Sequence, residues 1–375
     1  MKILIATGIY PPDIGGPAQY AKGVEEVWRK QGSFGETQDL RPFAKHQDLR
    51  PFAKHQDLRH QVKVLAFSAV MRTSVLTRKL PTGIRHLYYF FRVLFSLPGV
   101  DFVFSPDTFS AALPALLAAK LLGKKIILRT GGDFLWEAYV ERTGDLVLLK
   151  HFYQKSMRHF NLKERIIFHL VRFLFRHADA IIFSTTWQKD IFAEPYGLNS
   201  GKCFVVENYY GSKTRSDLFP DTRSDLVRKV FVGGTRELKW KNIPRVREAF
   251  EKVRSRGGEA TLELQTGSRT EFLKTIENGY AVILASLGDV SPNTILEAIA
   301  FNKPFILTRE TGLYERLKDI GLWVNPEDTE DIAQKIAWLS DEKNFEEQCR
   351  KVAAFTFTHS YEQIAEEILD VYART

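Results

Sequence analysis

Residues 281–300 read AVILASLGDVSPNTILEAIA and divide into three parts of different character. Ala281–Ala285 is a continuous apolar run of strand length, and Asn293–Phe301 carries apolar residues at helical spacing. Between them, Ser291 and Pro292 signal a helix start. Serine can cap the first turn, and proline is accepted there because the first turn does not need the amide N–H that proline lacks. A buried strand that leads through a short loop into a helix is the repeating unit of parallel α/β sheets.

The same alternation of strand and helix extends through both halves of the chain. Near-continuous apolar strands between helices are typical of parallel sheets buried on both faces. We predict strands at Lys2–Thr7, Val62–Phe67, Phe102–Phe104, Lys125–Arg129, Ala180–Ser184, Cys203–Val206, Lys229–Val232, Ala260–Leu264, Ala281–Ala285, Pro304–Leu307 and Gly321–Val324. We predict helices at Ala18–Lys30, Phe109–Leu122, Lys163–His177, Pro244–Arg256, Ser268–Asn278, Asn293–Phe301 and Thr329–Leu339.

A polar stretch without periodicity, Asn208–Lys229, separates two such halves. The length of 375 residues fits about two domains. We therefore expect two doubly wound α/β domains that face each other across a cleft, residues 1–210 and 211–355. A C-terminal helix within residues 356–375 is expected to pack back on the first domain. Ligands of open α/β sheets bind at the carboxyl ends of the strands, where the loops considered below lie.

A tandem repeat interrupts the first half. The nonapeptide QDLRPFAKH occupies Gln38–His46 and Gln47–His55, and a partial third copy runs from Gln56 to Arg59. A period of nine fits neither helix nor strand, and the proline in each complete copy would stop a helix. Without Ser33–Arg59 the chain reads VWRKQG–HQVKVLAF, a helix end followed by a strand start. We predict a surface-loop insertion at residues 33–59; a basic partner-binding loop is the alternative.

Composition and charge limit the classes of protein that the chain can belong to. Only two cysteines occur, Cys203 and Cys349, which excludes a disulfide framework or a cysteine zinc site and favours a reducing cytoplasm. No apolar run reaches the roughly 18 residues that span a bilayer. Residues 1–180 carry 27 Lys and Arg against 15 Asp and Glu, and the remainder carries 26 against 30. The basic first half suits a nucleic acid, an anionic membrane or a phosphorylated substrate, or is simply solvated charge.

Two loops carry candidate chemistry. Gly15 and Gly16 follow a proline turn and open a helix, where free amides can bind an anion; a tight turn is the alternative. Asp289 lies in a loop and Glu297 eight residues later, inside the next helix, so both carboxylates can accept hydrogen bonds from sugar or ribose hydroxyls. The plain alternative is a turn former and a solvated helix residue. A phosphate can bind at the start of that helix, formed by Ser291, Pro292, Asn293 and Thr294.

These motifs together resemble a known family. Tyr10–Gly16, YPPDIGG, and Asp289 followed by Pro292–Thr308, PNTILEAIAFNKPFILT, are similar to the hallmark of the retaining glycosyltransferases of family 4. The resemblance covers nearly the whole chain outside Ser33–Arg59. It implies the GT-B fold, two Rossmann-like domains with a nucleotide sugar between them, the first for the acceptor and the second for the donor. It also implies that Glu297 binds the ribose and that Asp289, where the family usually has Glu, binds the donor sugar.

A third segment, Phe231–Asn242, looks like the part of the family pattern in which an Arg and a Lys neutralise the diphosphate. Arg236 and Lys241 keep the five-residue spacing of that pair, with Lys239 as a substitute. Two cations there would stabilise the charge of a nucleoside diphosphate as it leaves. Many relatives have a histidine that touches the transferred sugar in the loop corresponding to residues 129–133. Here no histidine is present, and Asp133 is the candidate in its place.

The resemblance implies a retaining hexosyltransferase that moves a sugar from a nucleotide-diphosphate sugar to a hydroxyl, most plausibly on a lipid-linked or cell-envelope glycan. We expect no metal site, no cofactor beyond the co-substrate and no nucleic-acid partner. The basic-aromatic stretches 85–92 and 158–176 suit the inner leaflet of an anionic membrane, or are ordinary buried helices. The competing hypothesis is a non-catalytic nucleotide-sugar-binding protein. Asp289 and a segment between Leu264 and Val282 that is shorter than in the family favour it.

Overall fold

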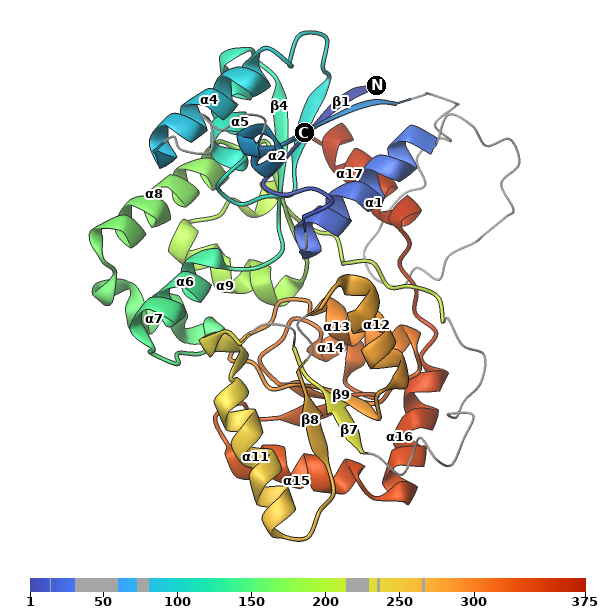
Figure 1. Cartoon of the computed structure of the whole chain (residues 1–375). Coiled ribbons are helices and arrows are strands. Elements are labelled where there is room, and N and C mark those ends of the chain that lie inside the picture. Colours follow the sequence, from blue (N-terminus) through green and yellow to red (C-terminus); the bar gives the residue numbers. More distant parts are fainter. Residues whose placement is uncertain (14, 31–59, 73–80, 214–228, 235–236, 265–266) are drawn as a thin grey trace. The chain divides into compact units, whose positions relative to one another are not determined.

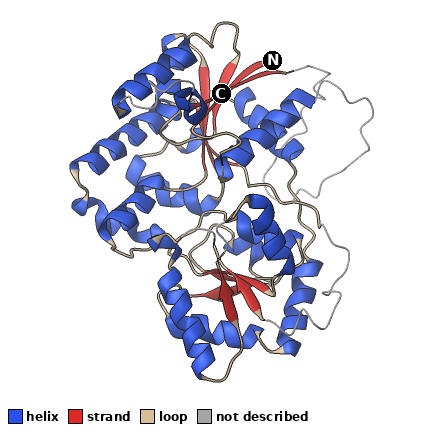
Figure 2. Ribbon diagram, in the orientation of Figure 1, coloured by secondary structure: helices blue, strands red, loops and turns tan. Residues whose placement is uncertain are grey.

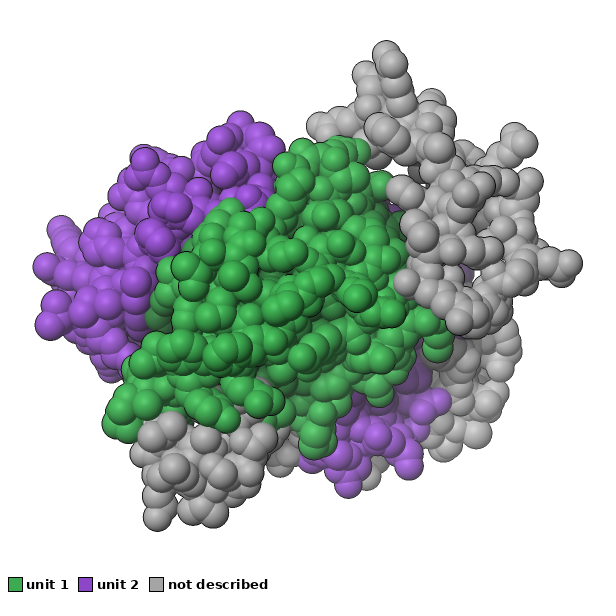
Figure 3. All heavy atoms as spheres, turned by 90° about the horizontal axis from the view of Figure 1, so that it is seen from above, with its two compact units in different colours: residues 1–128, 361–375 green, residues 129–360 purple. Residues whose placement is uncertain are grey.

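The structure is a computed structural model, and it describes residues 1–13, 15–30, 60–72, 81–213, 229–234, 237–264 and 267–375. The predicted insertion at residues 33–59 lies outside the described residues. Contacts divide the chain into two compact units, coloured separately in Figure 3: unit 1 is Met1–Leu128 with Tyr361–Thr375, and unit 2 is Arg129–Ser360. These are units of contact, and the predicted domain boundaries at residues 210 and 355 stay predictions.

The first sheet has six strands in the order β2-β1-β3-β4-β5-β6 (Figure 1). The pairings of β1 with β2 and β3, of β3 with β4, and of β5 with β6 are parallel. β1, β3, β4 and β5 are almost wholly buried, which explains their near-continuous apolar sequences. The strands are β1 Lys2–Thr7, β2 Gln61–Ala66, β3 Phe102–Ser105, β4 Lys125–Thr130, β5 Ala180–Phe183 and β6 Cys203–Val205.

The second sheet has five strands in the order β11-β10-β9-β7-β8, and its pairings are also parallel. Figure 2 shows helices beside the strands of both sheets. The strands are β7 Val230–Val232, β8 Thr261–Glu263, β9 Ala281–Leu284, β10 Phe305–Thr308 and β11 Leu322–Val324. Every predicted strand is present to within two residues at either end. The prediction of two parallel α/β sheets is confirmed.

The helices of unit 1 are α1 Gly16–Lys30, α2 Phe67–Arg72, α4 Thr82–Leu94, α5 Ala112–Leu121 and α17 Tyr361–Ala373. The longer helices of unit 2 are α6 Phe134–Thr143, α8 Leu162–His177, α9 Thr186–Tyr196, α11 Ile243–Ser255, α12 Arg269–Asn278, α13 Asn293–Ala300, α15 Thr329–Leu339 and α16 Glu342–Ala354. The shorter ones are η1 Leu149–His151, α7 Phe152–Ser156, η2 Met157–His159, η3 Ser200–Lys202, η4 Lys239–Lys241 and α14 Tyr314–Leu317. All seven predicted helices are present, and of the longer helices α4, α6, α9 and α16 were not predicted.

The core of unit 1 forms around the indole of Trp28, which is fully buried on α1. Its ring packs edge-on against Phe102 and Phe104 of β3. Its Nε1 donates to the carbonyl of Ala365 at 3.3 Å, and Tyr372 stacks on Phe102. The C-terminal helix α17 is therefore part of the same core as the first strands of the chain.

Each face of the second sheet has its own core. Phe231, Ile283 and Ile306 pack on one face with the apolar sides of α11 and α15. Val232, Val282 and Leu307 pack on the other face with α12 and α13. Because both faces are covered, polar ligands can meet this sheet only at its strand ends, and the loops at the carboxyl ends of β7, β9 and β10 hold the residues described below.

The ends of α1 and β2 predict the effect of removing the repeat. α1 ends at Lys30 and β2 begins at Gln61, so deletion of residues 33–59 leaves Gln31, Gly32 and His60 as the connection. Three residues fall within the usual range of roughly two to six for such loops. We expect the deletion variant to keep its thermal unfolding midpoint to within about 3 °C by differential scanning calorimetry. A large drop in the midpoint would show that the repeat supports the fold.

Candidate functional site

The loop that follows β9 is held in place by its neighbours along its whole length. The amide of Asp289 donates to the carbonyl of Glu310 at 2.9 Å, and Asp289 and Thr311 form a parallel bridge. The amide of Leu287 donates to the carbonyl of Trp240, also at 2.9 Å. A Cβ added at Gly288 would lie 2.5 Å from that of Leu149, so only glycine permits this close approach. The loop therefore presents Asp289 at a defined position.

Asp289 forms an ion pair with Lys241, a contact that sequence analysis did not predict. Lys241 Nζ lies 2.7 Å from Asp289 Oδ2, and the two side chains are only 16% and 13% exposed. The ammonium group also lies 4.2 Å from the centre of the Trp240 ring. A partly buried cation held by one carboxylate and one aromatic face can transfer its contact to an entering anion.

Glu297 lies in a second, separate ion pair. Its Oε1 is 2.7 Å from Arg269 Nη1 at the start of α12; Glu297 is 13% exposed and Arg269 is 46% exposed. Burial raises the pKa of the Glu297 carboxyl, and the neighbouring Arg269 opposes that shift. Among the described residues, no hydrogen bond or ion pair joins Glu297 directly to Asp289. The predicted pair of carboxylates thus appears as two acids, each matched by its own cation.

The first turn of α13 has the properties of an anion site. Its N-cap is Pro292, which offers no side-chain hydrogen bond, so the first amides of the helix have no acceptor within it. Ser291 Oγ is buried and has no hydrogen-bond partner among the described residues. Asn293 is exposed and Thr294 is half-buried on the same turn. A phosphate group would satisfy these donors and the helix dipole together.

A buried arginine supports this turn from the first sheet. Arg129, at the end of β4, is 4% exposed and donates from Nη2 to Ser184 Oγ and to Asn208 Oδ1. Asn208 Nδ2 in turn donates to the carbonyl of Ser291 at 3.3 Å. The positive charge of Arg129 is thus linked through one amide to the start of α13. Sequence analysis missed this role, because a single arginine at a strand end is not a motif.

The candidate site residues fall in a segment that is similar to a known family. Residues 227–342 match the sequence model of the family described as glycosyl transferases group 1. This segment contains Lys241, Asp289, Glu297 and the first turn of α13. Over these residues the chain resembles the group 1 glycosyl transferases. Among curated proteins, no sequence match to the chain is found.

Solved structures show the GT-B fold for the whole chain. HepE from Anabaena, crystallised with UDP, is 13% identical, with a TM-score of 0.62 and 100% of each chain covered. Sucrose-phosphate synthase from Thermosynechococcus elongatus is also 13% identical, with a TM-score of 0.62 and coverage of 100% and 98%. A glycosyltransferase from Rickettsia africae is 14% identical, with a TM-score of 0.57 and coverage of 99% and 97%. The resemblance inferred from the motifs is confirmed at the level of group 1 and the GT-B fold.

Three other predicted site residues lie outside the matched segment 227–342 or outside the described part of the chain. Arg236 lies outside the described residues. Gly15 and Gly16 lie at the start of α1 in unit 1, where the Gly15 carbonyl accepts from the amide of Gln19. The roles predicted for these three residues stay predictions.

Asp133 has a structural role that is plain from its contacts. Its Oδ1 caps α6 by accepting from the amides of Leu135 and Trp136, both at 3.1 Å. Its Oδ2 accepts from the Tyr153 hydroxyl at 2.6 Å, and Tyr153 meets Tyr196 at 2.8 Å. The carboxylate is 4% exposed. Its proposed contact with the transferred sugar stays a prediction, and its three hydrogen bonds explain the residue without that contact.

A third ion pair, with a buried acid and an exposed lysine, was not predicted from sequence. Lys150 Nζ lies 2.6 Å from Glu310 Oε1, and Glu310 is 9% exposed. Glu310 directly follows β10, and its carbonyl accepts the amide of Asp289. The Lys150–Glu310 pair therefore braces the loop that carries the donor-site acid. The 160 residues between the partners explain why no local pattern revealed it.

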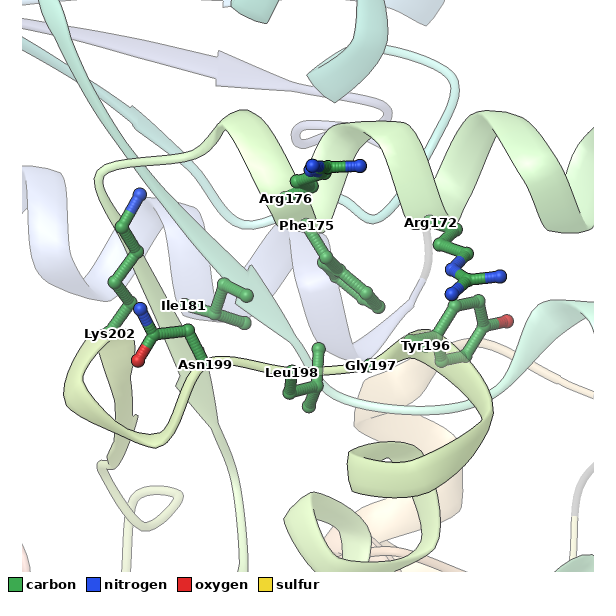
Figure 4. A pocket seen from close by; sticks show the side chains of 9 residues that line it. All are labelled: Arg172, Phe175, Arg176, Ile181, Tyr196, Gly197, Leu198, Asn199 and Lys202. Atoms are coloured by element: carbon green, nitrogen blue, oxygen red, sulfur yellow. The ribbon is translucent and has the colours of Figure 1, made fainter.

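A pocket of about 380 Å³ lies elsewhere in unit 2, between α8, β5 and the chain that enters β6 (Figure 4). Figure 4 shows Phe175 and Ile181 between Arg172 and Lys202. Lys202 Nζ donates to the carbonyl of Ala178, which caps α8. The pocket is at the amino ends of β5 and β6, and its cations complement the helix end there. It is thus distinct from the donor-binding loops at the carboxyl ends.

Within the part of the chain that the structure describes, no three His, Cys, Asp or Glu side chains gather closely enough to hold a metal ion. The expected absence of a metal from the reaction stays a prediction. Likewise, among the described helices none is both long and apolar enough to cross a membrane.

The burial of Asp133 predicts how stability depends on pH. Burial raises the pKa of its carboxyl from 3.8 to about 6, against the lowering effect of the Tyr153 and amide hydrogen bonds. Because the folded state holds the proton more tightly, this group's contribution to stability is full below about pH 4 and is lost as the pH rises through 6. Asp133→Asn keeps the cap. In the parent protein the unfolding free energy should fall between pH 4 and pH 7. In Asp133→Asn, measured by urea titration, this fall should be smaller by about 2–3 kcal/mol. Asp145→Asn, at an exposed position, is the control, and an unchanged pH slope for Asp133→Asn contradicts the assignment.

Proposed function

We propose that this chain transfers a sugar from a nucleotide-diphosphate sugar to a hydroxyl group, with retention of configuration at the anomeric carbon. The observation that carries the proposal is the ion pair that Lys241, from the turn after β7, forms with Asp289, in the loop that leads into α13. The cation suits a diphosphate, the acid suits a sugar hydroxyl, and the helix N-terminus suits a phosphate oxygen.

The diphosphate is proposed to bind the amides of the α13 first turn and the hydroxyl of Ser291. Lys241 would then leave Asp289 for a phosphate oxygen, where it meets the negative charge that grows as the bond from the anomeric carbon to the leaving diphosphate breaks. Asp289, released from the lysine, would accept a hydrogen bond from a hydroxyl of the sugar. One rearrangement thus prepares both the leaving group and the sugar.

Glu297 is proposed to accept hydrogen bonds from the two ribose hydroxyls. In the present structure the Glu297 carboxylate forms an ion pair with Arg269. Arg269 is almost half exposed, so it can swing into solvent when the ribose enters. The raised pKa of the Glu297 carboxyl reflects burial, which Arg269 opposes. A ribose that donates two hydrogen bonds would favour the charged carboxylate in place of Arg269.

The similar structures support a nucleotide-sugar donor. HepE from Anabaena has been crystallised with UDP, with UDP-glucose, and with UDP and glucose. A UDP-forming trehalose-phosphate synthase from Burkholderia xenovorans has been crystallised with glucose-6-phosphate. We propose a hexose as the transferred sugar and a lipid-linked or cell-envelope glycan as the acceptor, with the enzyme in the cytoplasm at the inner face of the membrane.

A charge-neutral change at Glu297 tests the ribose role. Glu297→Gln keeps the shape and loses the charge, and hydrogen bonds to a charged acceptor are worth roughly 1.5–3 kcal/mol each. We expect about ten- to hundredfold weaker binding of the nucleoside diphosphate by titration calorimetry, with little change in the unfolding midpoint. Glu327→Gln, at an exposed position, is the matched control. Binding as tight as that of the parent protein would refute the ribose assignment.

The role of Lys241 is tested by turnover. Lys241→Ala should lower kcat by about a hundredfold with the cognate donor, because it removes a charge that acts on the leaving group. Arg256→Ala is the control, since Arg256 pairs with Glu330 in an exposed bridge on the same domain. Equal, small effects would contradict the phosphate assignment. Donor binding without any turnover in the parent protein would instead favour the non-catalytic alternative.

A further inference from the structure

Exposed apolar side chains gather on two adjacent helices of unit 1. α4 and α5 pack against each other, as Figure 1 also shows. Of the fourteen large apolar residues that are exposed in the described part of the chain, seven lie on these helices and their C-caps, between 43% and 77% exposed. Single exposed apolar residues are ordinary, whereas a group on adjacent helices marks an interaction site. We call this group the α4–α5 surface: Ile84, Leu87, Phe91, Phe95, Leu117, Leu121 and Leu122.

Packing among the described residues leaves this surface exposed. α4 buries its opposite side through Tyr89 and Val93, both fully buried, and the Tyr89 hydroxyl donates to the carbonyl of Leu65 at 2.6 Å. Ile84, Leu87 and Phe91 follow one another at helical spacing as a second apolar stripe on the exposed side. Because α4 is apolar on both sides, we expect its exposed side to contact an apolar partner outside the protein.

The charges around the surface are all of one sign in the sequence. Residues 58–100 and 108–132, which include both helices, contain no Asp or Glu. The cations on these helices and the turn after α5 are Arg85, Arg92, Lys120 and Lys124. Two copies of the chain meeting face to face through this surface would bring like charges together, which disfavours self-association. The surface fits a partner that is both apolar and anionic.

The aromatic residues suit the boundary between lipid headgroups and acyl chains. Phe91 and Phe95 stack at 6.3 Å on the exposed side, and Tyr88 is half-buried beside them. Amphipathic helices with Phe and Leu on one side and Lys or Arg at its margin lie in this boundary plane. We propose that the α4–α5 surface docks on an anionic bilayer, with its apolar stripe in the headgroup–acyl boundary and its cations at the lipid phosphates. The docking proposal rests on the proposed function in one respect: docking would give the enzyme access to a lipid-linked acceptor.

The test uses the full-length protein and vesicles of phosphatidylcholine with 0 or about 30% phosphatidylglycerol, in co-sedimentation. The variant Leu87→Glu/Phe91→Glu/Phe95→Glu places charges on the apolar stripe, and Leu146→Glu, at an exposed position of unit 2, is the control. We expect at least tenfold weaker partition of the triple variant into anionic vesicles and no change for the control. We also expect binding by the parent protein to fall when salt is raised from about 0.1 to 0.5 M.

Two outcomes overturn the proposal. One is equal vesicle binding by the parent protein and the triple variant. The other is a dimer of the parent protein, seen by sedimentation velocity and lost in the triple variant, without vesicle binding. Circular dichroism checks that the triple variant is folded. A second variant, Arg92→Ala/Lys124→Ala, leaves the apolar stripe intact. Its affinity should fall several-fold for anionic vesicles and stay unchanged for neutral vesicles.

Donor binding, measured on the same proteins, separates this proposal from the proposed function. If the parent protein binds vesicles but no nucleoside diphosphate, the proposed function fails and the membrane surface stands. If the parent protein binds the nucleoside diphosphate but no vesicles, the membrane surface fails and the proposed function stands.

Discussion

The ion pair between Lys241 and Asp289 is the contact on which the site depends. It joins the turn after β7 to the loop after β9, and both side chains are largely withdrawn from water. Taking two charges out of water costs free energy that their attraction only partly returns. Such a pair is therefore better suited to exchange partners than to stabilise the fold. The loop itself is held by backbone bonds to Trp240 and Glu310, so it stays in place when the side chains rearrange.

The acidic and basic groups of the site are balanced before any ligand arrives. Asp289 is matched by Lys241, Glu297 by Arg269 and Glu310 by Lys150. In each case at least one partner is mostly buried, so the site could not present unpaired charges without a large desolvation cost. In the proposed function, an entering diphosphate and its ribose would replace one set of partners with another. Specificity for a ligand that carries both anionic and hydroxyl groups would follow from this exchange.

The two units have different surfaces. Unit 1 exposes an apolar stripe on α4 and α5 with cations around it, whereas the residues proposed to bind the donor belong to unit 2. The uneven distribution of net charge along the sequence has the same origin, since the segments of α4 and α5 contain no acid. The chain thus separates the surface proposed to meet lipid from the loops proposed to meet the nucleotide.

The amino-acid sequence alone determined the two parallel sheets, because buried strands must be continuously apolar and such runs stand out between helices. It also singled out Asp289 and Glu297 by their spacing around the start of α13, and Lys241 by its resemblance to a family segment. Of the longer helices it missed α4, α6, α9 and α16; α6 begins among aromatic residues and α9 contains Pro195, and both features weaken a helical pattern. Only the tertiary structure decided what each site residue touches. Arg269, Lys150 and Asn208 lie 28, 160 and 83 residues from the side chains or carbonyl that they contact, and no local pattern reports such a distance. The contrast between Asp289, partly open beside a lysine, and Asp133, buried as a helix cap, has the same cause, since burial and hydrogen-bond partners are properties of the packed chain.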